Sequence, residues 1–236
     1  MHSAYLIDSV TTVCNKEQSI NFLVDESGSI GASNFKYALD FLTIYVNQTL
    51  DDLSIMSINF FDSTFDPYIN FGYNRAQILS MIAAKSYRSA GTKTGNGINQ
   101  TVAKIMSQNF PNGLPKLMVI LTDGGSYDDV VYASAYARSK GITLFCVGIG
   151  ANINAAQLLQ IAGTQSNILY IQSYSTLSNL ATLISNYFCK QIIDVNLNDV
   201  IIGNVVRVPS SPNYYRVVRS PTAGQYYQLQ LIYQNY

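Results

Sequence analysis

Three nearly continuous apolar runs most constrain the fold of this chain. They are SINFLV (19–24), KLMVILT (116–122) and ITLFCVGIG (142–150). A strand with one face in water alternates apolar and polar residues, whereas a strand buried on both faces is apolar throughout. Segments with apolar residues at helical spacing lie between these runs. Strands that alternate with helices are typical of an α/β fold, in which helices cover both faces of a mostly parallel sheet.

Shorter segments complete the expected element order. We expect further strands at 53–61, 68–71 and 168–171, and helices at 75–85, 97–109, 129–139, 155–162 and 175–188, in addition to one that begins near Ser33. Ser33 is expected to cap that first helix, because a serine hydroxyl accepts from free amides. We expect Asp66-Pro67 to form a tight turn, and Ser126 with Asp129 to form a capping box.

Oxygen-bearing side chains gather in three loops that such a fold places at one edge of its sheet. Ligands of open parallel sheets bind at the carboxyl ends of the strands. DESGS (25–29) and TDGG (122–125) each follow an apolar run, and SAGTKTG (89–95) opens a helix between them in sequence. The oxygen donors are Asp25, Ser27, Ser29, Thr92, Thr94 and Asp123. Hard oxygen donors without His or Cys suit Mg²⁺ or Mn²⁺.

The spacing within the first loop has a mechanical reason. In an extended turn alternate side chains point the same way, so Asp25, Ser27 and Ser29 can face one ion. Gly28 is expected to let the backbone turn tightly enough to close these side chains around the ion. Asp25 could instead merely cap a turn, and Thr94 could be an ordinary helix N-cap. The other acids nearby, Glu26, Asp128 and Asp129, are expected to be solvated or capping residues, with Glu26 pointing away from the ion.

At these residues the chain resembles the von Willebrand factor type A domain family. The metal-ion-dependent adhesion site of that family has Asp-x-Ser-x-Ser in one loop, a Thr in a second and an Asp in a third. DESGS (25–29), GTKTG (91–95) and LTDGG (121–125) match in order, and FCVGIGANINAAQLLQIA (145–162) is similar to a late strand, loop and helix of the family. The resemblance covers roughly residues 14–190. It implies a Rossmann-like six-stranded sheet of order 3-2-1-4-5-6 with one antiparallel edge strand.

The resemblance also implies roles for individual residues. Asp25, Ser27, Ser29, Thr92 and Asp123 would hold the metal, and Thr94, Gly28 and Gly124 would support the ligand loops. The metal would be Mg²⁺ or Mn²⁺, and it would accept an acidic side chain of a protein ligand. Members of the family mostly mediate adhesion or matrix assembly, so an extracellular or cell-surface location is expected.

For each enzyme class that these residues could suggest, the chain lacks a residue that the site of that class needs. A serine nucleophile needs a general base, and the single histidine of the chain, His2, lies near the terminus. An aspartyl phosphatase loop needs a second carboxylate two residues after the first, where this chain has Ser27. GIGAN (148–152) lacks the third glycine and the acid of a dinucleotide-binding loop. We therefore expect no enzyme.

Charge and hydropathy exclude other partners. Fourteen basic and fourteen acidic residues cancel, so no basic field favours nucleic acid. No apolar run approaches the roughly 20 residues of a membrane span. The start of the chain, MHSAYLIDSV, lacks the pattern of a secretory signal, so a secreted protein would be a mature or trimmed form.

Cysteines and sequons provide candidate sites for a disulfide and for glycosylation, two modifications that are typical of extracellular proteins. Cys146 lies in an apolar run and is expected to be a small core residue. Cys14 and Cys189 could close the domain with one disulfide, or both could be free. Asn47 and Asn99 begin N-x-T sequons and are candidates for glycosylation.

The composition changes after Cys189. Residues 191–236 are rich in β-branched residues and tyrosine, with Pro-containing turns, and we expect a small β-rich extension or the start of a following module.

The sequence leaves two functions open. One is an extracellular adhesion protein that binds a partner through the metal. The alternative is a structural or self-assembly module in which the C-terminal tail makes the contacts and the metal is structural.

Overall fold

The computed structural model describes residues 19–48, 55–110, 114–151, 153–181 and 184, together with the backbone of 192–195 and 214–217. The chain forms two compact units, one of residues 16–185 and one of residues 1–15 with 186–236. The domain limits expected at 14 and 190 lie outside the described residues and remain predictions.

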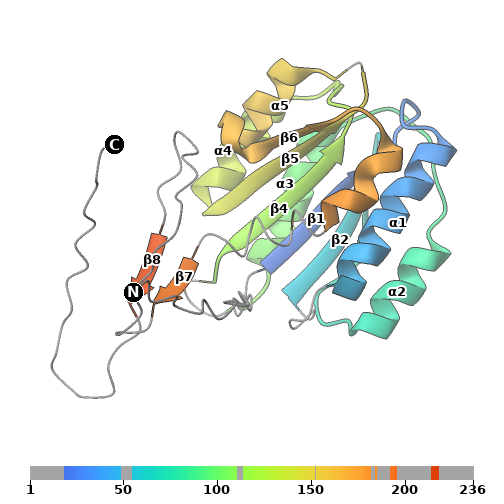
Figure 1. Cartoon of the computed structure of the whole chain (residues 1–236). Helices are drawn as coiled ribbons and strands as arrows, with labels where there is room; N and C mark the ends of the chain where they lie inside the picture. The colour runs from blue at the N-terminus through green and yellow to red at the C-terminus, as the bar shows by residue number, and fades with distance from the viewer. Residues whose placement is uncertain are drawn as a thin grey trace, which may run out of the picture. The chain divides into compact units, whose positions relative to one another are not determined.

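The larger unit is built on a six-stranded sheet (Figure 1). Its strands are β1 (Ser19–Asp25), β2 (Met56–Phe61), β3 (Phe65–Ile69), β4 (Lys116–Thr122), β5 (Ile142–Ile149) and β6 (Ile168–Ile171). Their spatial order is β3-β2-β1-β4-β5-β6. β3 runs antiparallel to β2, and every other neighbouring pair is parallel. The expected fold class, strand order and antiparallel edge strand are confirmed.

Helices cover both faces of this sheet (Figure 1). They are α1 (Ala32–Gln48), α2 (Arg75–Ala84), α3 (Thr94–Met106), α4 (Val130–Ser139) and α5 (Ala155–Ala162), with the 3₁₀ helices η2 (Gln165–Asn167) and η3 (Tyr174–Asn179). On one face α1 packs against α2 and η3, and on the other α4 packs between α3 and α5.

The apolar runs are explained by the position of their strands. Every residue of β1 is buried, because β1 lies between β2 and β4 in the centre of the sheet. The Phe22 ring meets Phe41 and Tyr45 of α1 edge-on, at centroid distances of 5.9 and 4.9 Å. Leu23, the next residue, belongs to the core cluster that contains Ile98 of α3. Consecutive residues of β1 thus pack against opposite helical layers.

The edge strand β3 differs from the expectation. Asp66 and Pro67 lie inside β3, and the turn is formed by residues 62–64. The Asp62 carboxylate closes this turn by accepting from the Thr64 amide at 2.7 Å. A proline is tolerated in β3 because an edge strand has one side without a pairing partner. Upstream, the strand expected at 53–61 begins only at Met56.

Three expected helix starts also need correction. Ser33 lies in the first turn of α1 and does not precede the helix. The helix expected at 97–109 is α3, which begins three residues earlier at Thr94. Asp129 is the N-cap of α4 and accepts from the Val131 and Tyr132 amides, whereas Ser126 contacts other residues. The starts of α3 and α4 follow from capping contacts that hydrophobic spacing cannot indicate.

The segment expected as a helix at 175–188 begins as 3₁₀ structure. Residues 174–179 form η3, residues 180, 181 and 184 are helical, and the remaining positions lie outside the described residues. Cys146 is buried and free, as expected of a small core residue. No helix within the described ranges is long and apolar enough to cross a membrane.

The smaller unit contains a pair of short parallel strands. β7 (Ile192–Val195) pairs with β8 (Tyr214–Val217), with Ile192 opposite Tyr214. The other residues of the β-rich extension expected at 191–236 lie outside the described residues, and that extension stays a prediction. Both Cys14 and Cys189 lie outside the described residues, so their disulfide remains a prediction.

Candidate functional site

The first candidate loop begins at the end of the central strand. Asp25 is only 1% exposed, and its Oδ1 accepts from the Ser27 amide at 2.9 Å. The hydroxyl oxygens of Ser27 and Ser29 lie 3.1 Å apart. Ser27 is buried, and Ser29 is exposed. The alternating positions therefore bring their oxygens together at the carboxyl end of β1.

The third loop adds a residue that sequence reasoning missed. Thr122, the last residue of β4, donates its hydroxyl to Asp25 Oδ2 at 2.7 Å and accepts from the Gly124 amide at 3.0 Å. Asp123 follows and is half-buried. Strand register could have indicated Thr122, because Val24 pairs with Leu121 and the next residues are then neighbours.

Gly124 is needed for its conformation. Its φ is +88°, a region that L-residues rarely adopt, and an added Cβ would lie 3.1 Å from the Asn154 amide nitrogen. Gly28 is different. Its φ is not positive, and a Cβ there would meet Ala90 O at 3.5 Å, which is ordinary contact. Gly28 lies in a turn, as expected, but the conformation of that turn does not demand a glycine.

Backbone hydrogen bonds tie the second loop to the other two. The Gly28 amide donates to Ala90 O at 2.8 Å, which joins the first loop to the second. The Tyr127 amide donates to Thr92 O at 3.0 Å, which joins the third loop to the second. Both Thr92 and Thr94 are buried, at 5% and 1% exposure. The three loops thus form one connected structure.

The start of α3 is held by side chains of the third loop. Asp128 accepts from the Gly95 and Asn96 amides at 2.9 and 2.7 Å, and Ser126 Oγ accepts from the Thr94 amide at 2.9 Å. These contacts satisfy the free amides of the first helical turn. Thr94 is the first residue of α3, so it is not the N-cap that was considered. Asp128 is a capping residue, but for α3 rather than for α4.

Asp25 is buried, and none of the described residues forms an ion pair with it. Burial raises the pKa of its carboxyl to about 6, an effect that the hydrogen bonds from Ser27 and Thr122 oppose and the charge of Asp123 reinforces. Within the described part of the chain, no Lys or Arg forms an ion pair with Asp25. A buried carboxylate is costly unless a cation compensates its charge. The site therefore fits a bound cation.

Glu26, the next residue, is in the opposite situation. It is fully buried, and its Oε2 lies 2.8 Å from Lys85 Nζ while Oε1 lies 3.5 Å from Arg88 Nε. The expectation of a solvated or capping residue is wrong for Glu26. The carboxylate points to Lys85 and Arg88, which sequence reasoning did not identify. Fifty-nine positions separate Glu26 from Lys85, so no local pattern could have shown this pair.

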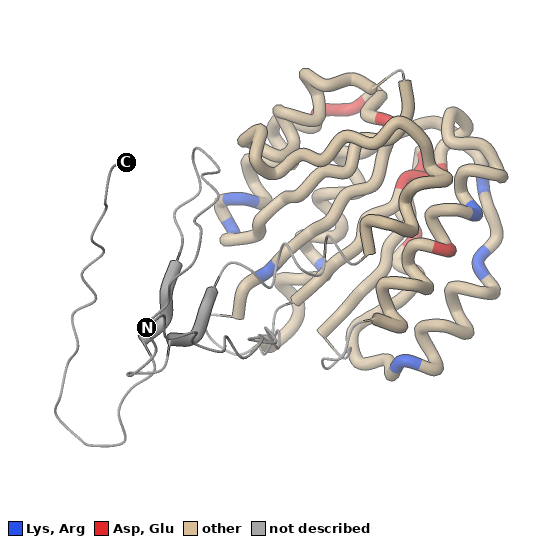
Figure 2. The backbone as a smooth tube through the Cα atoms, viewed as in Figure 1, with Lys and Arg blue, Asp and Glu red and all other residues tan. Residues whose placement is uncertain are grey.

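The donors at the Asp25 edge are oxygen atoms. Across the described residues there is no group of three or more His, Cys, Asp and Glu that could hold a metal, so hydroxyls must complete any metal site here. Figure 2 shows acidic residues gathered at the end of the domain toward which β1 and β4 run. Oxygen donors of this kind suit a hard divalent cation.

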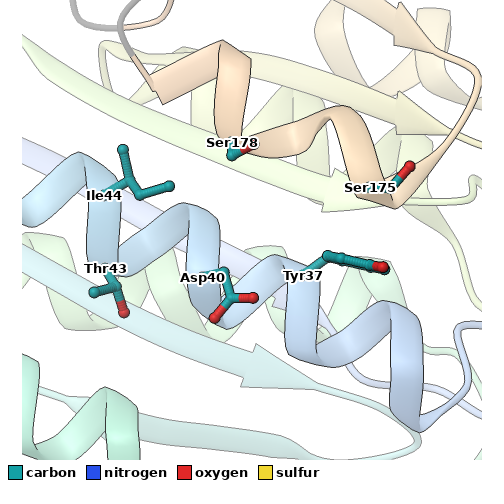
Figure 3. A pocket seen from close by; sticks show the side chains of 6 residues that line it. All are labelled: Tyr37, Asp40, Thr43, Ile44, Ser175 and Ser178. Carbon is teal, nitrogen blue, oxygen red and sulfur yellow. The ribbon is translucent and has the colours of Figure 1, made fainter.

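Two further features lie away from this edge. A pocket of about 370 Å³ is lined by Tyr37, Asp40, Thr43 and Ile44 of α1 and by Ser175 and Ser178 of η3 (Figure 3). It contains none of the expected site residues. The sequons remain predictions: Asn47 is exposed at the end of α1, and Asn99 is half-buried within α3.

Solved structures share this fold. The proximal thread matrix protein 1 of the mussel byssus, with a zinc-occupied MIDAS motif, superposes with a TM-score of 0.68 at 22% identity, over 75% of this chain and 49% of that protein. The manganese-loaded TRAP protein of Plasmodium vivax gives a TM-score of 0.56 at 22% identity, over 71% of this chain and 73% of that one.

Sequence comparison extends the likeness to curated proteins. Mouse Vitrin is 27% identical over 183 residues, which is 75% of this chain and 28% of Vitrin. Guinea-pig (Cavia porcellus) Cochlin is 29% identical over 189 residues, which is 77% of this chain and 34% of Cochlin. The chain thus spans about a third of the length of these relatives. The family model of the von Willebrand factor type A domain matches residues 19–183. Fold and sequence together show that the chain belongs to the von Willebrand factor type A domain family.

Proposed function

We propose that this chain is a non-enzymatic adhesion module of the extracellular matrix or cell surface. It holds Mg²⁺ or Mn²⁺ at the carboxyl edge of its sheet and uses that metal to bind an acidic side chain of a partner protein. The metal-holding residues are Asp25, Ser27, Ser29, Thr92 and Asp123, with Thr94 in support.

The burial of Asp25 without a Lys or Arg partner among the described residues is the observation that carries this proposal. An acid at 1% exposure with a pKa of about 6 destabilises the folded chain when it ionises. Its neighbour Glu26 is compensated by Lys85 within the chain. A cation from solution is the simplest compensation for Asp25, and hydroxyls of Ser27 and Ser29 lie beside it.

The donor types support the choice of metal and the kind of partner. A divalent cation bound here supplies a Lewis acid that attracts an anionic ligand. The chain provides two carboxylates, Asp25 and Asp123, and otherwise neutral hydroxyls, so little negative charge is available to neutralise the ion. Hydroxyl and carboxylate oxygens favour hard ions such as Mg²⁺ and Mn²⁺. The neighbours of the same fold with zinc and with manganese support a divalent ion at this edge.

The non-enzymatic and extracellular assignments rest on two further points. Ser27 and Ser29 have no histidine beside them among the described residues, since the single histidine of the chain is His2. A serine without a base is a weak nucleophile. The likeness to a matrix protein of the mussel byssus supports the matrix location.

Titration calorimetry with Mg²⁺ and Mn²⁺ tests the metal site. Wild type should bind one ion, and Asp25→Asn should lose binding. Asp40→Asn on α1 is the matched control, because it also removes one acid but lies in the pocket beside η3. If wild type binds these ions no more tightly than Asp25→Asn does, the proposed metal site is refuted.

A second experiment tests the use of the metal. Peptides that contain glutamate are compared with the same peptides containing glutamine, on immobilised protein with Mg²⁺ or with EDTA. Glutamate peptides should be retained only with Mg²⁺ and only by proteins with an intact Asp25. Equal retention of both peptide sets would contradict an acidic ligand at the metal.

A further inference from the structure

One short segment touches the first metal loop at several points. It is KSYRSA (85–90), which leads from the end of α2 into the second loop, includes the first two residues of that loop, and is here called the clamp segment. It has no helical or strand structure of its own. Its conformation is therefore set by contacts with its surroundings.

Tyr87 makes the most direct of these contacts. Its hydroxyl donates to Ser27 O at 2.6 Å and accepts from the Gly31 amide at 3.0 Å. One oxygen atom thus bridges two points of the first loop on either side of Ser29. The Tyr87 ring packs on Phe35 of α1, with ring centroids 5.2 Å apart, so the hydroxyl is held in place from behind.

The following residues add two backbone bonds. The Ser89 amide donates to Glu26 O at 3.2 Å, and Ala90 O accepts from the Gly28 amide at 2.8 Å. Ser89 has a φ of +61° and is the one non-glycine residue of the described chain with a positive φ. Such a conformation is costly and persists only where the surroundings determine it. The clamp segment is thus held in a strained shape against the first loop.

Ion pairs anchor the clamp segment to the body of the domain. Lys85 Nζ lies 2.8 Å from Glu26 Oε2 and 4.5 Å from the Phe60 ring centroid. Arg88 Nη2 lies 2.9 Å from Asp62 Oδ1. These contacts fix the clamp segment on both sides of Tyr87, so its hydroxyl cannot shift without breaking them.

We propose that the clamp segment preorganises the first metal loop and that Tyr87 is a positioning residue for the metal. The inference rests on the proposed metal site and adds to it a residue that contacts no metal. Two glycines, Gly28 and Gly31, would give a free loop many conformations. The bridge from Ser27 O to the Gly31 amide selects the conformation in which the hydroxyls of Ser27 and Ser29 adjoin.

The test compares two tyrosine variants by calorimetry with Mn²⁺. Tyr87→Phe removes both hydrogen bonds and retains the ring. Tyr68→Phe is the matched control, since its hydroxyl donates to Met81 O at 3.0 Å, away from the loop. Loss of a residue that orients metal ligands typically weakens metal affinity roughly 10–100-fold, and this is expected for Tyr87→Phe alone. A purely structural role would lower the melting temperature of both variants without separating their affinities.

The outcomes distinguish the two proposals. If wild type binds no metal, the proposed function fails. If wild type binds and Tyr87→Phe binds with equal affinity, only the role of Tyr87 is overturned.

Amide exchange of wild type supplies a second test that needs no variant. Saturating Mg²⁺ should slow exchange of the Gly28 and Gly31 amides, which bond to the clamp segment, and should leave the Gln77 amide at the start of α2 unchanged. If calorimetry shows that wild type binds Mg²⁺, unchanged exchange at Gly28 and Gly31 would overturn the inference even if Tyr87→Phe does not fold.

Discussion

Two consecutive acids at the end of β1 have opposite surroundings. Glu26 is buried against Lys85 and Arg88, and these two cations oppose the rise in its pKa that burial causes. Asp25 is equally buried, but its hydrogen-bond donors among the described residues are the neutral groups of Ser27 and Thr122. Burial alone therefore does not mark a functional acid. Among the described residues Glu26 has Lys85 as an ion-pair partner and Asp25 has no such partner, and this difference is the reason that Asp25 is proposed to bind a metal.

Removing Lys85, the ion-pair partner of Glu26, should have the largest effect on the free energy of unfolding. Lys85→Met leaves Glu26 buried with only the more distant Arg88, and loss of one partner of a buried ion pair costs about 3–5 kcal/mol. Urea unfolding should show this loss at neutral pH. The double variant Lys85→Met/Glu26→Gln should recover much of the stability. Full stability of Lys85→Met would show that the pair contributes little.

Neutralising Asp25 should have the opposite effect and stabilise the folded chain. Its folded pKa of about 6 lies above the ordinary 3.8, so its contribution to stability is present below pH 3.8 and is lost as pH rises through about 6. The shift of about 2 units corresponds to about 3 kcal/mol. In EDTA near neutral pH, Asp25→Asn should therefore be more stable than wild type in urea unfolding. A destabilised Asp25→Asn would contradict the account.

Removal of a donor to Asp25 should have a smaller effect. Thr122→Val deprives Asp25 Oδ2 of its hydroxyl and the Gly124 amide of its acceptor, at a cost of about 2 kcal/mol. Thr101→Val is the control, because the buried Thr101 hydroxyl has no hydrogen-bond partner among the described residues. Its replacement should leave stability nearly unchanged. Thermal unfolding measures the stability of both variants, and equal losses of stability in Thr122→Val and Thr101→Val would indicate a packing effect alone.

The smallest expected effect lies at the start of α3. Asp128→Ala frees the Gly95 and Asn96 amides, and loss of such a cap costs about 1 kcal/mol. Urea unfolding in EDTA measures it. Asp129→Ala should cost a similar amount at α4, where Asp129 accepts from the Val131 and Tyr132 amides. A loss confined to Asp129→Ala would show that α3 does not depend on the third loop.

Sequence reasoning succeeded where the signal was local. The central strands were predicted because burial on both faces leaves a continuous apolar run, as at β4 and β5. The fold places the loops that carry Asp25 and Asp123 at one edge, as expected, while their role as metal ligands stays a prediction. These features depend on residues that are near each other in the chain.

It failed where distant contacts decide the structure. α3 begins at Thr94 because Asp128 and Ser126, more than thirty positions later, satisfy its first amides. The turn was assigned to Asp66-Pro67, because an open edge that tolerates proline is visible only in the assembled sheet. The partners of Glu26 were hidden for the same reason.

The central claim is that a divalent cation supplies the charge that Asp25 lacks. Its most direct test is the unfolding free energy of wild type and Asp25→Asn in urea near neutral pH, with saturating Mg²⁺ and with EDTA. The account predicts that Asp25→Asn is the more stable protein in EDTA and that Mg²⁺ stabilises wild type alone, since only an ion that binds the folded state adds stability. Equal stabilisation of both proteins by Mg²⁺, or of neither, would contradict it.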